Sequence, residues 1–239
     1  MTKLDILAVG VHPDDVEISA GGTVIRHVQR GMKVGVLHLT KGELGTRGSA
    51  AIRMKEAAAA ASIMGVHVHD NMGFEDGFFE NDVKHRLRLI EKIRLYRPGI
   101  VLCNALHDRH PDHGRASQLV SESCFYSGLT RIRTKYKGKE QGAWRPKAVY
   151  HYIQDRAMRP SFVVDISEQL GKKMEAIRAY RSQFFDPSSK EPQTYISSPE
   201  FLDSIRNRCA EYGRIIGVKY AEAFVAERIF GIGSLSDLI

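Results

Sequence analysis

Two short segments bring together residue types that bind metal ions and transfer protons. The first is His12-Pro13-Asp14-Asp15, and the second is His110-Pro111-Asp112-His113. Together with Asp108, they offer three imidazoles and four carboxylates. About a hundred residues separate the two segments, so they can act as one site only if the fold brings them together.

Metal-assisted hydrolysis is the chemistry that these residue types favour. A catalytic zinc ion takes three protein ligands, commonly His and carboxylate, and keeps one position open for water. The set of His12, Asp15 and His113 meets this need, and it would accept Fe²⁺ as well as Zn²⁺. The pKa of a zinc-bound water falls to about 7, so a nearby carboxylate can take its proton. A nearby imidazolium can then stabilise an oxyanion or protonate a leaving amine.

Alternating strands and helices are predicted around these segments. Short apolar runs end at His-Pro, Gly or polar loops, and each is followed by a stretch of helical periodicity. Such units imply right-handed crossovers and a mostly parallel sheet. The predicted strands are 4–11, 33–40, 66–71 and 100–104, and the predicted helices are 18–30, 50–64 with Ser49 as its N-cap, 82–97 and 115–127.

The order of the strands determines whether the two segments meet. In a doubly wound sheet ordered 3-2-1-4-5, strands one and four are neighbours at the topological switch point. The segments follow these two strands, so they would face one crevice. The C-terminal third adds predicted strands at 148–153 and 162–166 and helices at 167–184 and 199–216. We therefore predict a Rossmann-like α/β fold with additional C-terminal strands and helices, in one domain spanning 1–239.

Composition favours a soluble globular protein. Of 239 residues, 43% are hydrophobic and 26% are charged, and the three cysteines form no CxxC pair. Met1–Asp5 leads directly into a strand, so we expect a cytoplasmic protein without a signal peptide or membrane span. The net charge of +7 is densest at 131–147, which we interpret as a solvated loop or hairpin rather than a phosphate-binding patch. A non-catalytic nucleotide- or nucleic-acid-binding module remains an alternative for a basic Rossmann-like chain.

Several motifs together resemble the PIG-L/LmbE family of zinc-dependent N-acetylglucosaminyl deacetylases. The similarity is greatest to the branch that includes the bacillithiol biosynthesis deacetylase, which acts on N-acetylglucosaminyl malate. The segments that carry it are His12–Asp15 with Glu17 and Gly21-Gly22, Thr40–Gly48, Arg53 with Glu56, Asp108–Ala116, Tyr180–Phe184 and Glu191–Ser197.

The resemblance implies a role for each matching position. Zinc would be bound by His12, Asp15 and His113, with Asp14 as the general base. His110 would be the protonated partner of the tetrahedral intermediate, oriented by Asp112, and Arg53 would hold substrate. It also implies a homo-oligomer, with a hexamer as one arrangement, and a small amino-sugar substrate rather than nucleic acid or membrane. A broader N-acetyl sugar deacetylase acting on GlcNAc or chitooligosaccharides is the alternative within the same chemistry.

Two further residues are candidates for substrate contact. Arg109 lies beside His110, and we hypothesise that it binds a substrate carboxylate in a bidentate manner. The alternative is an Arg that pairs with Asp108 or another surface acid. Tyr195 lies in a Pro/Ser-rich loop, and the resemblance makes it a mobile residue near the oxyanion, with a packed loop aromatic as the alternative.

Overall fold

The computed structural model describes residues 2–237. The strands are β1 (Ile6–Gly10), β2 (Val34–Thr40), β3 (Val68–Phe74), β4 (Ile100–Cys103), β5 (Lys135–Tyr136), β6 (Lys139–Glu140), β7 (Ala148–Tyr152), β8 (Phe162–Asp165) and β9 (Ala221–Ala226). The helices are α1 (Asp15–Gln29), α2 (Ala50–Met64), α3 (Val83–Tyr96), α4 (Pro111–Tyr126), α5 (Leu170–Arg178) and α6 (Pro199–Ile215), with 3-10 turns η1 (Tyr195–Ser197) and η2 (Leu235–Asp237).

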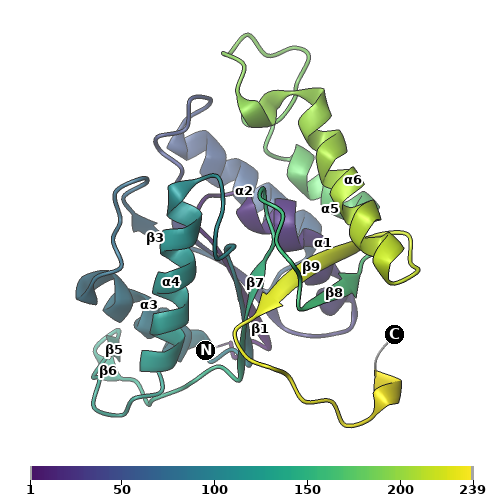
Figure 1. Cartoon of the computed structure of the whole chain (residues 1–239). Helices are drawn as coiled ribbons and strands as arrows, with labels where there is room; N and C mark the ends of the chain where they lie inside the picture. Colours follow the sequence, from purple (N-terminus) through teal and green to yellow (C-terminus); the bar gives the residue numbers. More distant parts are fainter. Residues whose placement is uncertain (1, 238–239) are drawn as a thin grey trace.

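Seven strands form the central sheet in the order β3-β2-β1-β4-β7-β9-β8 (Figure 1). The first five are parallel, and β9 runs antiparallel to both of its neighbours. The predicted order 3-2-1-4-5 is confirmed, with β7 as the fifth strand. The ends of β1 and β4 therefore lie side by side at the switch point, as the two histidine segments require.

Helices cover both faces of the sheet, and each face has its own hydrophobic core. On one face, Val16 and Val24 of α1 pack with Met174 of α5 and with strand residues such as Ala8. On the other face, Leu89 of α3 and Leu119 of α4 pack against the opposite side of the same strands. The α/β class, mostly parallel and flanked by helices, is confirmed. The single-domain boundary of 1–239 stays a prediction.

Local signals fixed several helix ends as predicted. Ser49 accepts a hydrogen bond from the backbone N–H of Ile52 and begins α2, and Gly65 ends it with a φ of 74°. Two helices begin earlier than predicted. Helix α1 starts at Asp15, and α4 starts at Pro111, where the ring suits the first helical position. Each histidine segment thus reaches into the first turn of a helix.

The C-terminal third differs most from the prediction. Helix α5 covers only Leu170–Arg178 of the predicted 167–184, and β9 was not predicted. Strand β9 includes buried Glu222, whose carboxylate pairs with Lys173 at 2.5 Å and obscures the apolar pattern of the strand. In the basic stretch 131–147, β5 and β6 form the expected hairpin.

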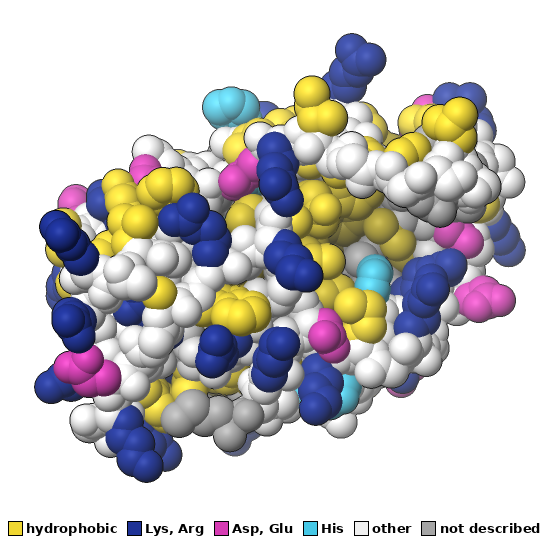
Figure 2. Space-filling model, turned by 90° about the horizontal axis from the view of Figure 1, so that it is seen from below, with side chains coloured by type: hydrophobic (Ala, Val, Ile, Leu, Met, Phe, Trp, Pro, Cys, Tyr) yellow, Lys and Arg dark blue, Asp and Glu magenta, His cyan; other side chains and the backbone are white. Residues whose placement is uncertain are grey.

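The molecular surface carries its basic residues in dispersed positions. On the face shown in Figure 2, Lys and Arg side chains lie among hydrophobic and acidic ones rather than in one continuous patch. Within residues 2–237, no helix has the length and apolar character needed to cross a membrane.

Candidate active site

The loop after β1 holds Asp14 in an unusual backbone conformation. Its φ of 119° lies in the region that non-glycine residues avoid, at a cost of about 1–3 kcal/mol. Although Asp14 occupies the N-cap position of α1, its side chain makes no capping hydrogen bond. Its buried carboxylate instead accepts a hydrogen bond from Nη2 of Arg53 at 3.1 Å. The Asp14 side chain therefore pairs with Arg53 instead of capping α1.

Asp15 lies between the two predicted metal-binding histidines. Its Oδ2 is 3.6 Å from Nδ1 of His12, and its Oδ1 is 3.2 Å from Nε2 of His113. Asn104 donates to Oδ2 at 3.0 Å, and Gln154 donates to Oδ1 at 2.7 Å. The carboxylate is therefore fixed in position and is almost fully buried.

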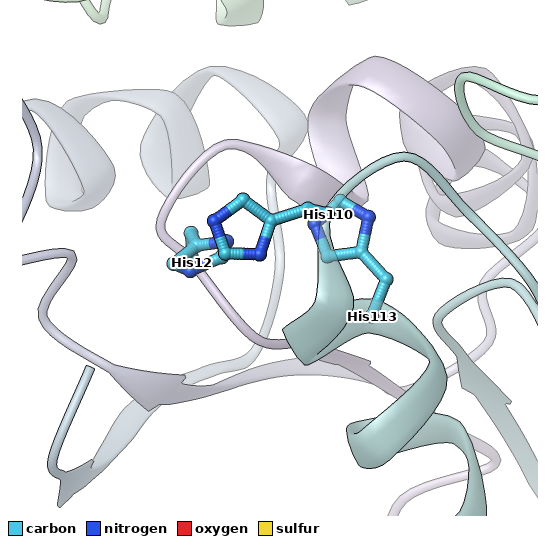
Figure 3. A group of neighbouring side chains, drawn as sticks. All are labelled: His12, His110 and His113. Atoms are coloured by element: carbon cyan, nitrogen blue, oxygen red, sulfur yellow. The ribbon is translucent and has the colours of Figure 1, made fainter. Parts of the chain in front are cut away.

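Three imidazoles from the two segments converge (Figure 3). The ring centroids of His12 and His113 are 5.6 Å apart, and the ring of His110 lies 4.7 Å from His12 and 5.3 Å from His113. His12 comes from the loop after β1, whereas His110 caps α4 and His113 belongs to its first turn. The expectation that the two segments meet in one crevice is confirmed.

Carboxylates on the far side of each ring fix the orientation of the candidate ligands. Asp108 contacts Nδ1 of His113 at 2.5 Å, so Nε2 points toward Asp15. Asp76 contacts Nε2 of His12 at 3.0 Å, so Nδ1 faces Asp15. Metal-binding histidines are usually held in this way. The donor types and their burial suit a zinc or iron ion, and the ligand set of His12, Asp15 and His113 stays a prediction.

Two other groups of donors overlap with this set. One nitrogen from each of His12, His110 and His113 lies within 4.8 Å of the others, and the same holds for donor atoms of His12, Asp76 and Asp112. Asp76 was missed in the sequence, where Asp76-Gly77 indicated only a turn.

The remaining predicted residues have clear positions. The carboxylate of Asp112 accepts from Arg115 and from the backbone of Gly77, and it lies 3.7 Å from Nε2 of His12. Asp112 meets His110 through its backbone N–H, which donates to Nδ1 at 3.3 Å, and not through its carboxylate. The predicted orientation of His110 by the Asp112 side chain stays a prediction.

Arg53 connects Asp14 to the neighbouring loops. Besides Asp14, it donates to the backbone oxygens of Gly42 and Pro13, each at 3.0 Å. Its Nε has no hydrogen-bond partner among the described residues. Arg53 also lines the cavity, so it is placed to hold both the Asp14 carboxylate and a ligand.

Arg109 and Tyr195 meet at the rim of the cavity on a shared acid. Arg109 donates to Oδ2 of Asp155, and the Tyr195 hydroxyl donates to Oδ1, both at 3.0 Å. The guanidinium also stacks over the Tyr195 ring at 4.5 Å. Arg109 thus has a protein carboxylate as its partner, as in the alternative considered above, with Asp155 rather than Asp108 as the acid.

Burial and neighbouring charges shift the acidities in the site. Burial raises the pKa of Asp14 to about 6, against the opposing effect of Arg53. Burial opposes the charge on His113, but Asp15 and Asp108 outweigh it and raise the pKa of His113 to about 9. Burial and then repulsion from His12 and His113 lower the pKa of His110. The pKa values of Asp15, Asp76 and Asp108, which line the same cavity, are lowered instead. Asp14 therefore differs from these three carboxylates, because its pKa has moved toward the range of a general base.

The site opens into a cavity of about 340 Å³. Asp14, Asp15, His110 and His113 line its floor, and residues from η1 and α6 contribute to its wall. This volume is suited to a small-molecule ligand.

Comparison with known proteins defines the family. The profile of the PIG-L family, described as GlcNAc-PI de-N-acetylase, matches residues 7–124. The chain is similar to the diacetylchitobiose deacetylase of Thermococcus kodakarensis, at 29% identity over 91% of this chain and 80% of that protein. A probable N-acetyl-alpha-D-glucosaminyl L-malate deacetylase 2 of Bacillus anthracis is 28% identical over 75% of this chain and 81% of that protein.

A solved structure shares the fold over nearly the whole chain. The crystal structure of a conserved protein from Thermus thermophilus has a TM-score of 0.85 and 33% identity, covering 96% of this chain and 98% of that one. The chain belongs to the PIG-L family, which confirms the family expected from its motifs. The bacillithiol branch is not singled out, because the diacetylchitobiose deacetylase has almost the same identity as the malate deacetylase and matches a larger part of this chain.

Proposed function

We propose that this protein is a metal-dependent hydrolase that removes the acetyl group from an N-acetylglucosaminyl conjugate. The observation that carries this proposal is the convergence of His12, Asp15 and His113 beside the strained carboxylate of Asp14, at the floor of one cavity. Family membership supports the same class of reaction.

His12, Asp15 and His113 would hold the metal ion. The ion, when bound, supplies Lewis acidity, which acidifies a water molecule and polarises the amide carbonyl. We assign Asp76 and Asp108 to the support of the two imidazoles, because each contacts the nitrogen that faces away from Asp15. If His12, Asp76 and Asp112 held the ion instead, Asp15 and His113 would not bind metal.

Asp14 would act as the general base. Water adds to the amide carbon while its proton passes to the Asp14 carboxylate. The C–N bond then breaks, the amine takes up a proton, and acetate is released. Arg53 keeps the Asp14 carboxylate in place through the contact at 3.1 Å.

His110 would stabilise the tetrahedral intermediate. Its lowered pKa favours a neutral ring in the free protein. Negative charge that develops on the substrate oxygen would favour the imidazolium, which can donate to that oxygen or to the departing nitrogen.

The aglycone of the substrate is the finer part of the proposal. Arg109 is occupied by Asp155, so a carboxylate such as that of malate would have to displace a protein acid there. Arg208 lines the same cavity, donates to the backbone oxygen of Gln154, and forms no ion pair with any described residue. We infer that Arg208 is the better candidate to meet an acidic aglycone, whereas a chitooligosaccharide would make no use of its charge.

Metal analysis and a substrate panel test the proposal. Purified protein should hold about one divalent ion per chain and release acetate from GlcNAc-malate, diacetylchitobiose or GlcNAc. Asp15→Asn should lose the metal ion, whereas Asp76→Asn should weaken its binding less. The opposite ranking would favour the His12, Asp76 and Asp112 set. Metal-free protein that binds DNA or RNA and releases no acetate would overturn the assignment.

A further inference from the structure

A chain of buried contacts leads away from the candidate metal site, starting at Asn104. This residue follows β4 and is fully buried. Its Nδ2 donates to Oδ2 of Asp15 at 3.0 Å, and its Oδ1 accepts from the backbone N–H of Val11 at 3.1 Å. Asn104 therefore fixes both ends of the loop that carries His12.

His151 holds Asn104 from the other side. Its Nδ1 lies 2.9 Å from the backbone oxygen of Asn104, and its Nε2 lies 2.9 Å from Oε1 of Glu227. A carbonyl oxygen and a carboxylate both accept, so both ring nitrogens of His151 carry hydrogen. The side chain is 1% exposed, and such a buried ring is stabilised by having both of its N–H groups paired.

His151 also joins the elements that carry the two histidine segments. It lies on β7 opposite Cys103 of β4, and its Nδ1 is 3.0 Å from the hydroxyl of Ser117 on α4. Helix α4 begins with the segment that contains His113. The ring therefore lies where the supports of both segments meet, although it does not line the cavity.

We propose that His151 and Glu227 are positioning residues, which act through Asn104 to hold Asp15 in the geometry that binds the metal ion. The inference rests on the proposed function, because it assumes that Asp15 is a metal ligand. Burial opposes the charge on His151, but Cys103, Glu227 and the Asn104 carbonyl outweigh it and raise the pKa of His151 to about 11.

The test measures zinc affinity by chelator competition and the rate constants of the loaded enzyme for three variants, His151→Ala, Glu227→Ala and Glu227→Gln. Loss of a residue that supports a metal ligand typically weakens affinity about 10- to 100-fold. His151 lies one contact beyond Asn104, and Glu227 acts through His151. We therefore expect a smaller loss, of about 3- to 10-fold for both Ala variants, with a lower kcat and an unchanged KM. Glu227→Gln keeps an oxygen acceptor and should recover most of the affinity.

His85→Ala is the matched control. His85 pairs with Asp82 at 2.8 Å at the start of α3. The His85→Ala variant therefore loses a His–carboxylate contact similar to that between His151 and Glu227. Its zinc affinity should equal that of the wild type. Should His151→Ala fail to fold, the two Glu227 variants still decide, because that side chain is 35% exposed.

The possible results separate the two proposals. Wild-type protein that binds zinc, with Glu227→Ala within twofold of its affinity, overturns the positioning role alone. Wild-type protein that binds no divalent ion overturns both the metal site and this inference.

Discussion

Replacement of Asp14 by Asn tests the proposed general base with little change of shape. The amide cannot accept the proton of water, and loss of a general base typically costs about 10²- to 10⁴-fold in rate, or about 2.7–5.4 kcal/mol. Asp14 is not among the three proposed ligands, so we expect Asp14→Asn to retain its metal ion. Its kcat for acetate release should therefore fall by at least about 100-fold at full zinc occupancy.

The structure also indicates the effect on stability. Arg53 loses an ionic partner but keeps the carbonyl oxygens of Gly42 and Pro13. The Asn oxygen can still accept a hydrogen bond from Arg53. Burial raises the pKa of Asp14 to about 6, so the ionised carboxylate is disfavoured in the folded protein at neutral pH, and the neutral Asn removes this cost. We therefore expect Asp14→Asn to have a Tm no lower than that of the wild type at neutral pH.

Asp14→Gly separates the carboxylate from the backbone strain. This variant lacks the carboxylate, so it should lose as much activity as Asp14→Asn. Glycine adopts a φ of 119° without steric cost, so Asp14→Gly should melt at a higher temperature than Asp14→Asn. Measurements of acetate release, zinc content and thermal melting together show whether the Asp14 carboxylate acts as the base or as a metal ligand. If Asp14→Asn keeps its zinc and a kcat within threefold of the wild type, Asp14 is not the base. If it loses zinc, the carboxylate belongs to the metal site instead.

Three more substitutions probe the rest of the site. His113→Ala should lose its metal ion and its activity together, and activity retained in metal-free protein would contradict the ligand assignment. Arg109→Ala should reduce kcat/KM about equally on GlcNAc-malate and GlcNAc, because its partner is Asp155, whereas a selective loss on the malate substrate would restore the role predicted from the sequence. In Gly42→Ala, the added Cβ would lie 2.0 Å from Nη1 of Arg53, and the φ of 64° adds strain. We expect a Tm lower by several degrees and a reduced kcat, and a fully active variant would show that Arg53 can move without consequence.

The central part of the fold could be predicted because its signals are local. Apolar runs bounded by glycine and His-Pro marked β1 to β4, and Ser49 and Gly65 marked the ends of α2. Strand β9 was not predicted from such local signals. It lies late in the chain between β7 and β8, and buried Glu222 is tolerated there only because Lys173 and backbone N–H groups of α1 surround its carboxylate.

For the site, the sequence by itself supplied the residue types that do chemistry and placed them after two strands whose ends had to be neighbours. That inference rests on the apolar patterns, which are local, and on the strand order of a doubly wound sheet, which was assumed as the fold class. The proposed homo-oligomer and cytoplasmic location stay predictions from the same source.

Only the tertiary structure decided which groups hold those residues in place. Gln154 contacts Asp15 across 139 positions of the chain, and Asp76 contacts His12 across 64. Arg109 donates a hydrogen bond to Asp155, which lies 46 residues further along the chain. Such contacts leave no periodic trace in the sequence, because they depend on the relative placement of loops once the two cores have packed.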